Sequence, residues 1–320
     1  MTRRAFLALI CMMIGLLGAY AQEKAPQSPI VVASLHPILG DMAQQIGGSH
    51  VTVVNLLKPN GNLHSFEPNP KDLNGLAKAQ IVLASGKNIE PYLNKLKESL
   101  GSTTKLIDLG ASIPDVPVVD SLKNEEADHE HVHGETCSCS HGPNDPHWWH
   151  TPNNMKRAAR SLVKELNALH PELKKDFDQG LKNWNKKMDQ LDTWAKKEMA
   201  SIPAEKRMIV TGHAAMNHFC KQYHFKSLSV QGISREDEGT TGRLAKLLKE
   251  LKNQQIDVVF PEYSSNPKSL TELANSMQMK IAKPLNTDGL APEGHTFETM
   301  FQTNVKNIKE ALAPTDKIEK

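Results

Sequence analysis

The sequence predicts an α/β fold with two lobes, each with a parallel sheet flanked by helices, joined by a long connecting α-helix. Short apolar runs alternate with segments of helical spacing in both halves of the chain, which is typical of parallel sheets. A long stretch of helical pattern lies between the halves. The 320 residues are also enough for about two domains.

The elements of the N-terminal half are predicted from apolar spacing and turn residues. Residues 30–35 are a short apolar run typical of a strand, and residues 37–46 show helical spacing before Gly47 and Gly48. The same alternation then predicts a strand over 51–57, a helix over 70–79, a strand over 81–84, a helix over 91–100 and a strand over 105–108. These segments make the first expected sheet.

The middle of the chain changes character twice. Residues 125–150 are rich in acids, His, Gly, Ser and Cys without apolar periodicity, which predicts a loop. Helical patterns follow over 153–169 and 171–199. At a rise of about 1.5 Å per residue, the second helix extends over about 40 Å, which is long enough to join two lobes.

The C-terminal half resumes the alternation of strands and helices. The pattern predicts strands over 208–211, 227–230, 258–260 and 280–282, with helices up to 223 and over 240–253, 268–277 and 296–312. No sequence repeat relates the halves. We therefore expect an N-terminal lobe over 22–170 with a histidine-rich loop at 125–146, a linking helix over 171–201, and a C-terminal lobe over 202–320.

The first 21 residues have the features of a cleavable signal peptide. Arg3 and Arg4 precede an apolar run over 6–17, and Ala-Tyr-Ala at 19–21 fits a cleavage site. Cys11 lies inside the apolar run and lacks the small residues that precede a lipid-modified cysteine. We expect a periplasmic or otherwise extracytoplasmic protein, exported by this cleavable signal peptide.

Charge and composition narrow the classes of partner. The formal net charge is +2, the basic residues form no concentrated stripe, and aromatic residues make up only 5% of the chain. Nucleic-acid binding usually needs a basic patch and stacking aromatics, so nucleic acid is not an expected partner. We expect a globular monomer.

Four side chains are candidates for a metal site at the carboxyl ends of the strands, where open α/β sheets bind ligands. His64, His213 and Asp288 follow predicted strands. His147 lies where the histidine-rich loop ends and the helical region begins. Three imidazoles and one carboxylate suit zinc, whereas manganese usually takes more oxygen ligands. Spacing alone does not establish the set, because its members are scattered along the chain.

The sequences around these residues carry a family resemblance over essentially the whole mature chain. The matching segments are His64-Ser-Phe-Glu-Pro68, Asp145-Pro-His-Trp-Trp149, Thr211-Gly-His-Ala214, Val259-Phe-Pro-Glu262 and Thr287-Asp288. In order and approximate spacing they resemble the zinc and manganese solute-binding proteins of ABC importers, of the zinc-uptake type. The resemblance implies His64, His147, His213 and Asp288 as metal ligands. It also implies a membrane permease with its ATPase as partner.

Three departures from the family pattern lie close to the candidate ligands. Asn62-Leu63 replaces the usual Asp-Pro before His64, His150 replaces the leucine that usually follows Trp149, and Ala214-Ala-Met-Asn217 replaces an aromatic segment. None of them removes a ligand. They change the packing around the site.

Further donors are candidates for auxiliary roles. The histidine-rich loop resembles the acidic loop of zinc-uptake members and is predicted to contact metal through His129, His131, His133, Cys137, Cys139 and His141. Glu262, at a strand end, is either a partner that orients a ligand imidazole or a surface acid. His36 and His218 are expected to have surface or packing roles, whereas His150, near His147, could substitute as a ligand.

The leading hypothesis is a non-enzymatic receptor that captures a divalent metal, zinc first and manganese second, and hands it to an importer. A zinc hydrolase would need an open coordination position, and the chain has no His-Glu-x-x-His helix. A metal-buffering or adhesin-like surface protein would use the histidine-rich loop as its main site. The receptor hypothesis instead makes the loop dispensable for tight binding.

Overall fold

The computed structural model describes most of the chain, in the stretches 28–58, 61–76, 78–118, 144–232, 241–263, 266–290 and 295–313. The expected signal peptide and the six auxiliary donors between 129 and 141 lie outside these described residues. Within the described stretches, no helix combines the length and the apolar character needed to cross a membrane.

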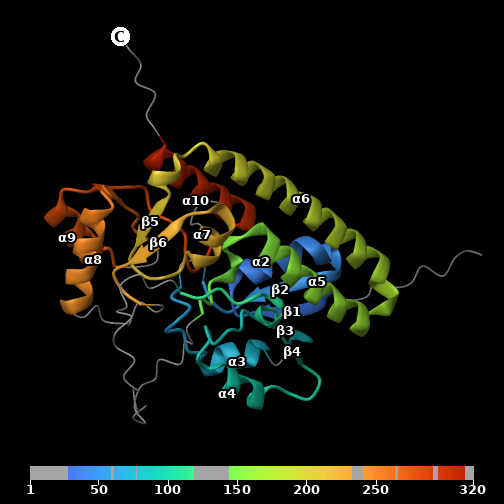
Figure 1. Cartoon of the computed structure of the whole chain (residues 1–320). Coiled ribbons are helices and arrows are strands. Elements are labelled where there is room, and N and C mark those ends of the chain that lie inside the picture. Colours follow the sequence, from blue (N-terminus) through green and yellow to red (C-terminus); the bar gives the residue numbers. More distant parts are fainter. Residues whose placement is uncertain are drawn as a thin grey trace, which may run out of the picture.

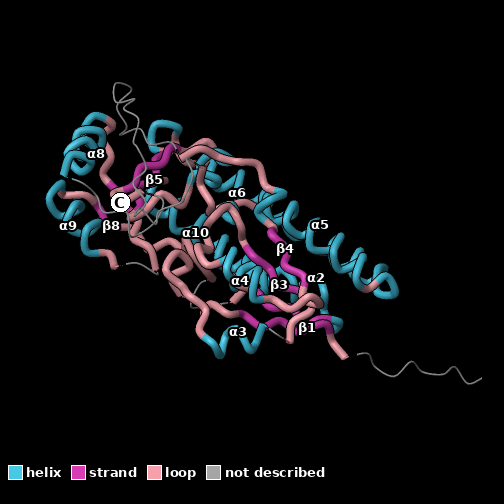
Figure 2. The backbone as a smooth tube through the Cα atoms, turned by 90° about the horizontal axis from the view of Figure 1, so that it is seen from below, coloured by secondary structure: helices cyan, strands magenta, loops and turns pink. Residues whose placement is uncertain are grey.

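A four-stranded parallel sheet lies in the N-terminal half, in the order β2-β1-β3-β4 (Figure 1), and Figure 2 shows β1, β3 and β4 from below. Its strands are β1 (Ile30–Ser34), β2 (Val51–Asn55), β3 (Ile81–Ala84) and β4 (Lys105–Asp108). Successive side chains point to opposite faces, so Val32 and Leu83 pack in one core and Ala33 and Val82 in another. The first core includes helix α2 (Pro37–Gly47); the second includes side chains of α3 (Pro70–Leu76) and α4 (Leu93–Ser99).

The C-terminal half repeats this strand order without a sequence repeat. Its elements are β5 (Met208–Thr211), α7 (Asn217–Tyr223), β6 (Lys226–Ser229), α8 (Thr241–Asn253), β7 (Val258–Val259), α9 (Lys268–Met277) and β8 (Lys280–Ile281). The strands pair as β5-β6 and β7-β8, all parallel. The Phe260 N–H donates to the Val210 carbonyl at 2.8 Å, which places β7 beside β5. The resulting order, β6-β5-β7-β8, matches that of the first sheet.

Long helices join the halves, as predicted. Helix α5 (Pro152–Leu169) is followed by a 3-10 turn over Pro171–Leu173 and then by α6 (Lys174–Ala200), which runs along both halves in Figure 1. The predicted helix began at residue 171. The difference arises because Pro171–Leu173 form the 3-10 turn, and Leu173, with φ of −99° and ψ of 5°, lies outside the α-helical region just before α6.

One hydrophobic core extends through both halves. It contains buried side chains from both sheets and from α2, α5, α6, α7 and the last helix, α10 (Phe297–Leu312). Val32, Trp184, Phe219, Phe260 and Phe301 are members from different parts of the chain. Close-packed interiors resist deformation, so this core limits how far one half can move against the other.

Helix α10 comes last in the sequence but contacts the N-terminal half. The Asp41 carboxylate of α2 accepts the N–H of Phe297 at 2.7 Å, and the Gln45 amide donates to Glu298 at 2.9 Å. Burial raises the pKa of Asp41 to about 6, although its hydrogen bonds oppose the shift. The start of α10 is therefore fixed to α2, across the expected lobe boundary.

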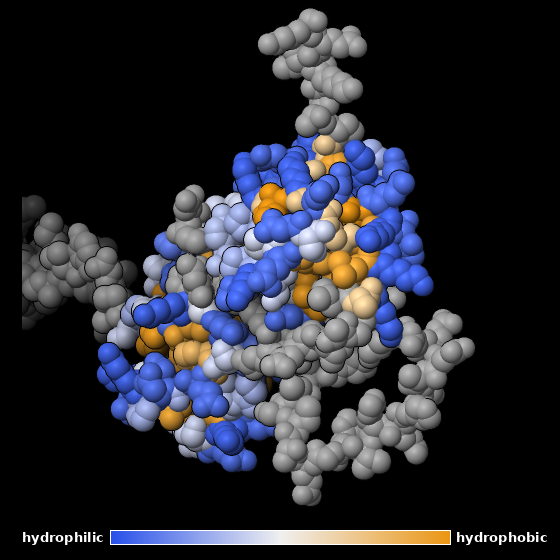
Figure 3. Space-filling view, turned by 90° about the vertical axis from the view of Figure 1, so that its left-hand side faces the viewer, coloured by the Kyte–Doolittle hydropathy of each residue, from blue (hydrophilic) through white to orange (hydrophobic). Residues whose placement is uncertain are grey.

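The described part of the face shown in Figure 3 is mainly hydrophilic. On the face in Figure 3, apolar residues appear as separate patches between hydrophilic ones. Among the described residues, the large apolar side chains with substantial exposure are Val54, Leu73, Leu169, Tyr263 and Ile281. They lie at scattered positions in the sequence, and the candidate ligands are buried away from solvent.

Candidate metal centre

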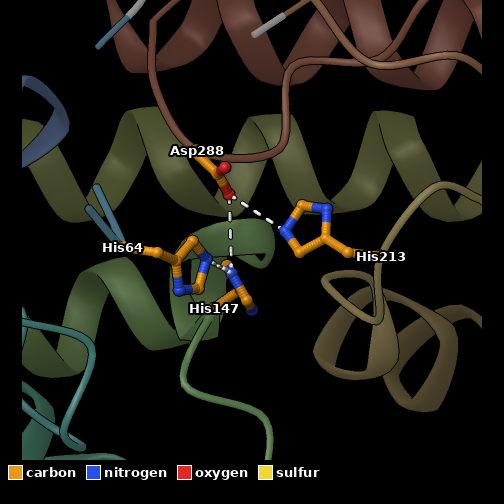
Figure 4. Close-up of side chains that lie close together, drawn as sticks. All are labelled: His64, His147, His213 and Asp288. Atoms are coloured by element: carbon orange, nitrogen blue, oxygen red, sulfur yellow. Dashed lines mark hydrogen bonds and ion pairs between the residues drawn. The ribbon is translucent and has the colours of Figure 1, made fainter. Parts of the chain in front are cut away.

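The structure brings four distant side chains together in the interior, as Figure 4 shows. They are His64, His147, His213 and Asp288, and each is at most 5% exposed. One donor atom from each lies within 4.8 Å of the donor atoms of the others. Two of the residues come from the N-terminal half and two from the C-terminal half, so the cluster lies where the halves meet.

The spacing of the donor atoms is close to that of a coordination shell. Nε2 of His64 lies 3.0 Å from Nε2 of His147. Oδ1 of Asp288 lies 3.4 Å from Nε2 of His147 and 3.3 Å from Nε2 of His213. Ligands at about 2.0–2.2 Å from a tetrahedral zinc stand roughly 3.3–3.6 Å apart. Small side-chain movements would complete a shell around one ion.

Local turns present two of the histidines. The backbone N–H of His64 donates to the Asn62 side chain at 3.0 Å, and that of His147 donates to Asp145 Oδ1 at 2.8 Å. Asn and Asp form such turns with the N–H two residues on. Asn62, which departs from the family pattern, therefore holds the backbone of the His64 turn. The 3-10 turn Trp148–His150 follows His147 directly.

Buried carboxylates orient two of the imidazoles. Nδ1 of His147 lies 2.7 Å from Asp145 Oδ1, and Nδ1 of His213 lies 2.8 Å from Glu262 Oε2. A carboxylate accepts, so each Nδ1 carries a proton and each Nε2 faces the centre of the cluster. Glu262 is only 4% exposed and also accepts the backbone N–H of His213 at 3.1 Å. In each half, a buried carboxylate thus orients one histidine through its Nδ1 atom.

The electrostatics around His213 favour a positive charge. Burial alone lowers its pKa, but the carboxylates of Glu262 and Asp288 outweigh burial and raise the pKa of His213 to about 10. Without a metal, the imidazole is protonated at neutral pH. A cation bound at Nε2 would take the place of this proton, so binding there would release a proton and weaken as the pH falls.

Asp145 was not among the predicted site residues. It is fully buried, and its Oδ2 accepts the backbone N–H of Asn217 at 2.9 Å. Burial acts to raise its pKa, but the hydrogen bond and charge of His147 prevail and hold the pKa of Asp145 well below its usual range. Asp145 therefore connects the His147 turn to helix α7. The available sequence signal was its position two residues before a candidate ligand.

Three histidines expected to have surface, packing or substitute roles are buried in this region. His36 and His150 point toward the segment that carries Asp288, and Nε2 of His218 lies 3.0 Å from the Asp145 carbonyl. Burial lowers the pKa of His36 to about 4 and, together with the charge of His147, that of His150 to about 3. Both are therefore neutral near pH 7. Nε2 of His150 is directed at the Thr287 carbonyl, 2.9 Å away.

Comparison with known proteins gives relatives along nearly the whole chain. The model of the family described as zinc-uptake complex component A, periplasmic, matches residues 31–311. The metal ABC transporter substrate-binding lipoprotein SloC of Streptococcus mutans is 25% identical over 322 residues, covering 98% of this chain and 100% of SloC. The manganese ABC transporter substrate-binding lipoprotein PsaA of Streptococcus mitis is 27% identical over 300 residues, covering 91% of this chain and 92% of PsaA.

Solved structures have the same fold. The periplasmic zinc binding protein TroA of Treponema pallidum has a TM-score of 0.77 at 22% identity, covering 90% of this chain and 100% of TroA. A manganese-bound periplasmic metal binding protein of Candidatus Liberibacter asiaticus has a TM-score of 0.75 at 21% identity, covering 88% of this chain and 99% of that protein. The chain therefore belongs to the zinc-uptake component A family, the zinc and manganese solute-binding proteins of ABC importers.

Proposed function

We propose that this protein is an extracytoplasmic receptor that binds one divalent transition metal ion, zinc first, between its two halves. His64, His147 and His213 supply nitrogen ligands, and Asp288 supplies oxygen. The loaded receptor delivers the ion to a membrane permease with its ATPase. The observation that carries this proposal is the convergence of four buried donor atoms from both halves within 4.8 Å of one another.

The donor set favours zinc over manganese. Three imidazole nitrogens and one carboxylate oxygen match the tetrahedral preference of zinc, whereas manganese usually takes a larger share of oxygen ligands. The relatives carry both names, since PsaA is described as a manganese protein and TroA as a zinc protein. The preference for zinc therefore rests on ligand chemistry, and manganese is the second candidate ion.

A binding role fits this donor set better than catalysis does. Four protein ligands saturate a tetrahedral zinc ion and leave no position for an activated water, which a hydrolase needs. Asp145 and Glu262 hold the Nδ1 atoms of two ligands, so neither is placed as a free general base. The proposal is therefore a carrier without catalytic residues.

The lobes and the export signal form part of the same proposal. Residues 22–170 and 202–320 form the two lobes, and residues 171–201 link them. The shared core and α6 limit the opening between the lobes to a small movement. Removal of residues 1–21 yields the mature receptor outside the cytoplasm.

Deleting residues 125–141 distinguishes the receptor hypothesis from the hypothesis of a metal-buffering or adhesin-like protein. We expect the deletion variant to bind one zinc ion per chain as tightly as the parent, because the four proposed ligands lie outside the deleted segment. Isothermal titration calorimetry of both proteins with zinc, and then with manganese, measures stoichiometry and affinity. Loss of the tight one-to-one event on deletion would contradict the receptor proposal and favour the buffering function.

A further inference from the structure

The peptide that carries Asp288 is held by side chains from the opposite half of the molecule. Nε2 of His36, at the start of α2, lies 3.1 Å from the Asp288 carbonyl oxygen. The Trp149 indole N–H donates to the Thr287 carbonyl at 3.0 Å, and Nε2 of His150 lies 2.9 Å from the same oxygen. Two adjacent carbonyls thus receive three donors from the N-terminal half.

These contacts are buried and well defined. His36, Trp149 and His150 are at most 1% exposed, and Thr287 and Asp288 are completely buried. A carbonyl oxygen can only accept, so Nε2 of each histidine carries the proton that it donates. Buried carbonyls need such donors, because a lost hydrogen bond leaves them without the water that would solvate them.

The donors are themselves fixed in the N-terminal half. The Ser85 hydroxyl lies 3.3 Å from Nδ1 of His36, where it can donate to the lone pair left by the Nε2 proton. The His36 and Trp149 rings pack edge to face, with centroids 4.5 Å apart. These contacts within the N-terminal half fix the His36 and Trp149 donors.

The segment on the other side is held by its own half. The backbone N–H of Asn286 donates to Asn304 Oδ1 at 2.8 Å, and the Asn304 amide donates back to the Asn286 carbonyl at 2.8 Å. Asn304 belongs to α10. Asn286 is therefore hydrogen-bonded to α10, whereas the next two residues, Thr287 and Asp288, are hydrogen-bonded to the N-terminal half.

We propose that His36, Trp149 and His150 are positioning residues that fix the Thr287–Asp288 peptide and so hold the Asp288 carboxylate toward His147 and His213. The inference rests on the proposed function, because it takes Asp288 as a metal ligand. The carboxylate is then presented to the ion by contacts with the half that supplies His64 and His147. Loss of one donor loosens Asp288, and the bound ion leaves faster.

Two matched pairs of variants test this role. Trp149→Phe removes the donor to Thr287, whereas Trp148→Phe removes an equally buried donor whose acceptor, the Ser85 carbonyl, lies within the N-terminal half. The Ser85 backbone stays held in Trp148→Phe, because its N–H donates to the Glu90 carboxylate at 2.6 Å. His150→Leu removes a second donor and replaces the buried imidazole with an apolar side chain of similar size. His150→Gln keeps an amide N–H that can reach the same carbonyl.

We expect Trp149→Phe and His150→Leu to weaken zinc binding about tenfold, the lower end of the effect of losing a partner that orients a ligand. Trp148→Phe and His150→Gln should bind zinc like the parent, although both tryptophan variants lose similar thermal stability. Competition titration with a chromophoric chelator gives the affinities. Equal affinity for the two tryptophan variants, or no recovery in His150→Gln, would overturn the positioning role.

Hydrogen–deuterium exchange of the metal-free proteins separates this inference from the proposed function. The peptide containing residues 285–290 should exchange faster in Trp149→Phe and His150→Leu than in their partner variants. Unchanged exchange would refute the positioning role even if zinc binds. If these variants exchange faster but the parent protein binds no zinc, the proposed function alone is refuted.

Discussion

Replacing His213 by alanine is expected to weaken zinc binding by more than about a hundredfold, which exceeds the usual effect of losing an outer partner of a ligand. His213 supplies a nitrogen at the cluster and is held by Glu262 through Nδ1 at 2.8 Å. The substitution removes one of four proposed ligands and leaves three. Competition titration against a chelator of known affinity measures the loss.

His170→Ala is the matched control for this result. His170 caps the C-terminal end of α5, whereas the His147 turn precedes the N-terminal end of the same helix. Nδ1 of His170 lies 3.3 Å from the Glu172 carboxylate. This variant should bind zinc like the parent. Both titrations are carried out well below the unfolding temperature. His213→Ala is expected to be less stable, because it leaves the buried carboxylates of Glu262 and Asp288 without the imidazole between them. Parent-like affinity in folded His213→Ala would remove His213 from the ligand set.

Asp145→Asn is expected to damage both stability and metal binding. The Asp145 carboxylate accepts the backbone and Nδ1 protons of His147 and two N–H groups of Asn217. An amide has only one accepting atom, so the buried network is broken. We expect a loss of about 3–5 kcal/mol in the free energy of unfolding. Zinc affinity should fall about 10- to 100-fold, because His147 loses the partner that orients it.

The pH dependence of this stability difference has a defined sign. The pKa of Asp145 lies well below its usual range in the folded protein and near about 3.9 in the unfolded chain. Its contribution is therefore complete above that value and is lost as the pH falls through the folded pKa. Denaturant unfolding of the parent and Asp145→Asn should give a gap that is widest at neutral pH and narrows in acid. A gap that does not change with pH would contradict the assigned role.

A matched control for Asp145→Asn is the same change at an exposed position. The Asp176 side chain on α6 is 60% exposed and its partner is His50 at 3.1 Å. Such surface pairs contribute little to stability. Asp176→Asn should therefore leave both the free energy of unfolding and zinc affinity within error of the parent.

Local patterns predicted the elements of the fold well because each element leaves a local trace in the sequence. The continuous apolar run of β3, whose four residues are all buried, and the helical spacing of α9 are visible in the sequence. The shared strand order of the two sheets was not visible, because topology can recur without sequence similarity. Likewise, the contact of α10 with α2 depends on Asp41 meeting Phe297, residues separated by almost the whole chain.

The candidate ligands were predicted from the family resemblance and from their positions in the fold. His64, His213 and Asp288 follow strands, and parallel strands bring their carboxyl ends to one edge, so sequence position carries spatial information. The side chains that hold these ligands lack that signal. His36 precedes a helix and His150 lies in a short turn, and their roles appear only when the Thr287–Asp288 segment packs against them.

The most direct test of the account is the position of the ion itself. Crystals of the zinc-loaded protein, measured on both sides of the zinc absorption edge, would show the metal as an anomalous difference peak. The account predicts one dominant peak at about 2.0–2.2 Å from Nε2 of His64, His147 and His213 and from a carboxylate oxygen of Asp288. A dominant peak bound by other side chains, with these four atoms uncoordinated, would contradict it.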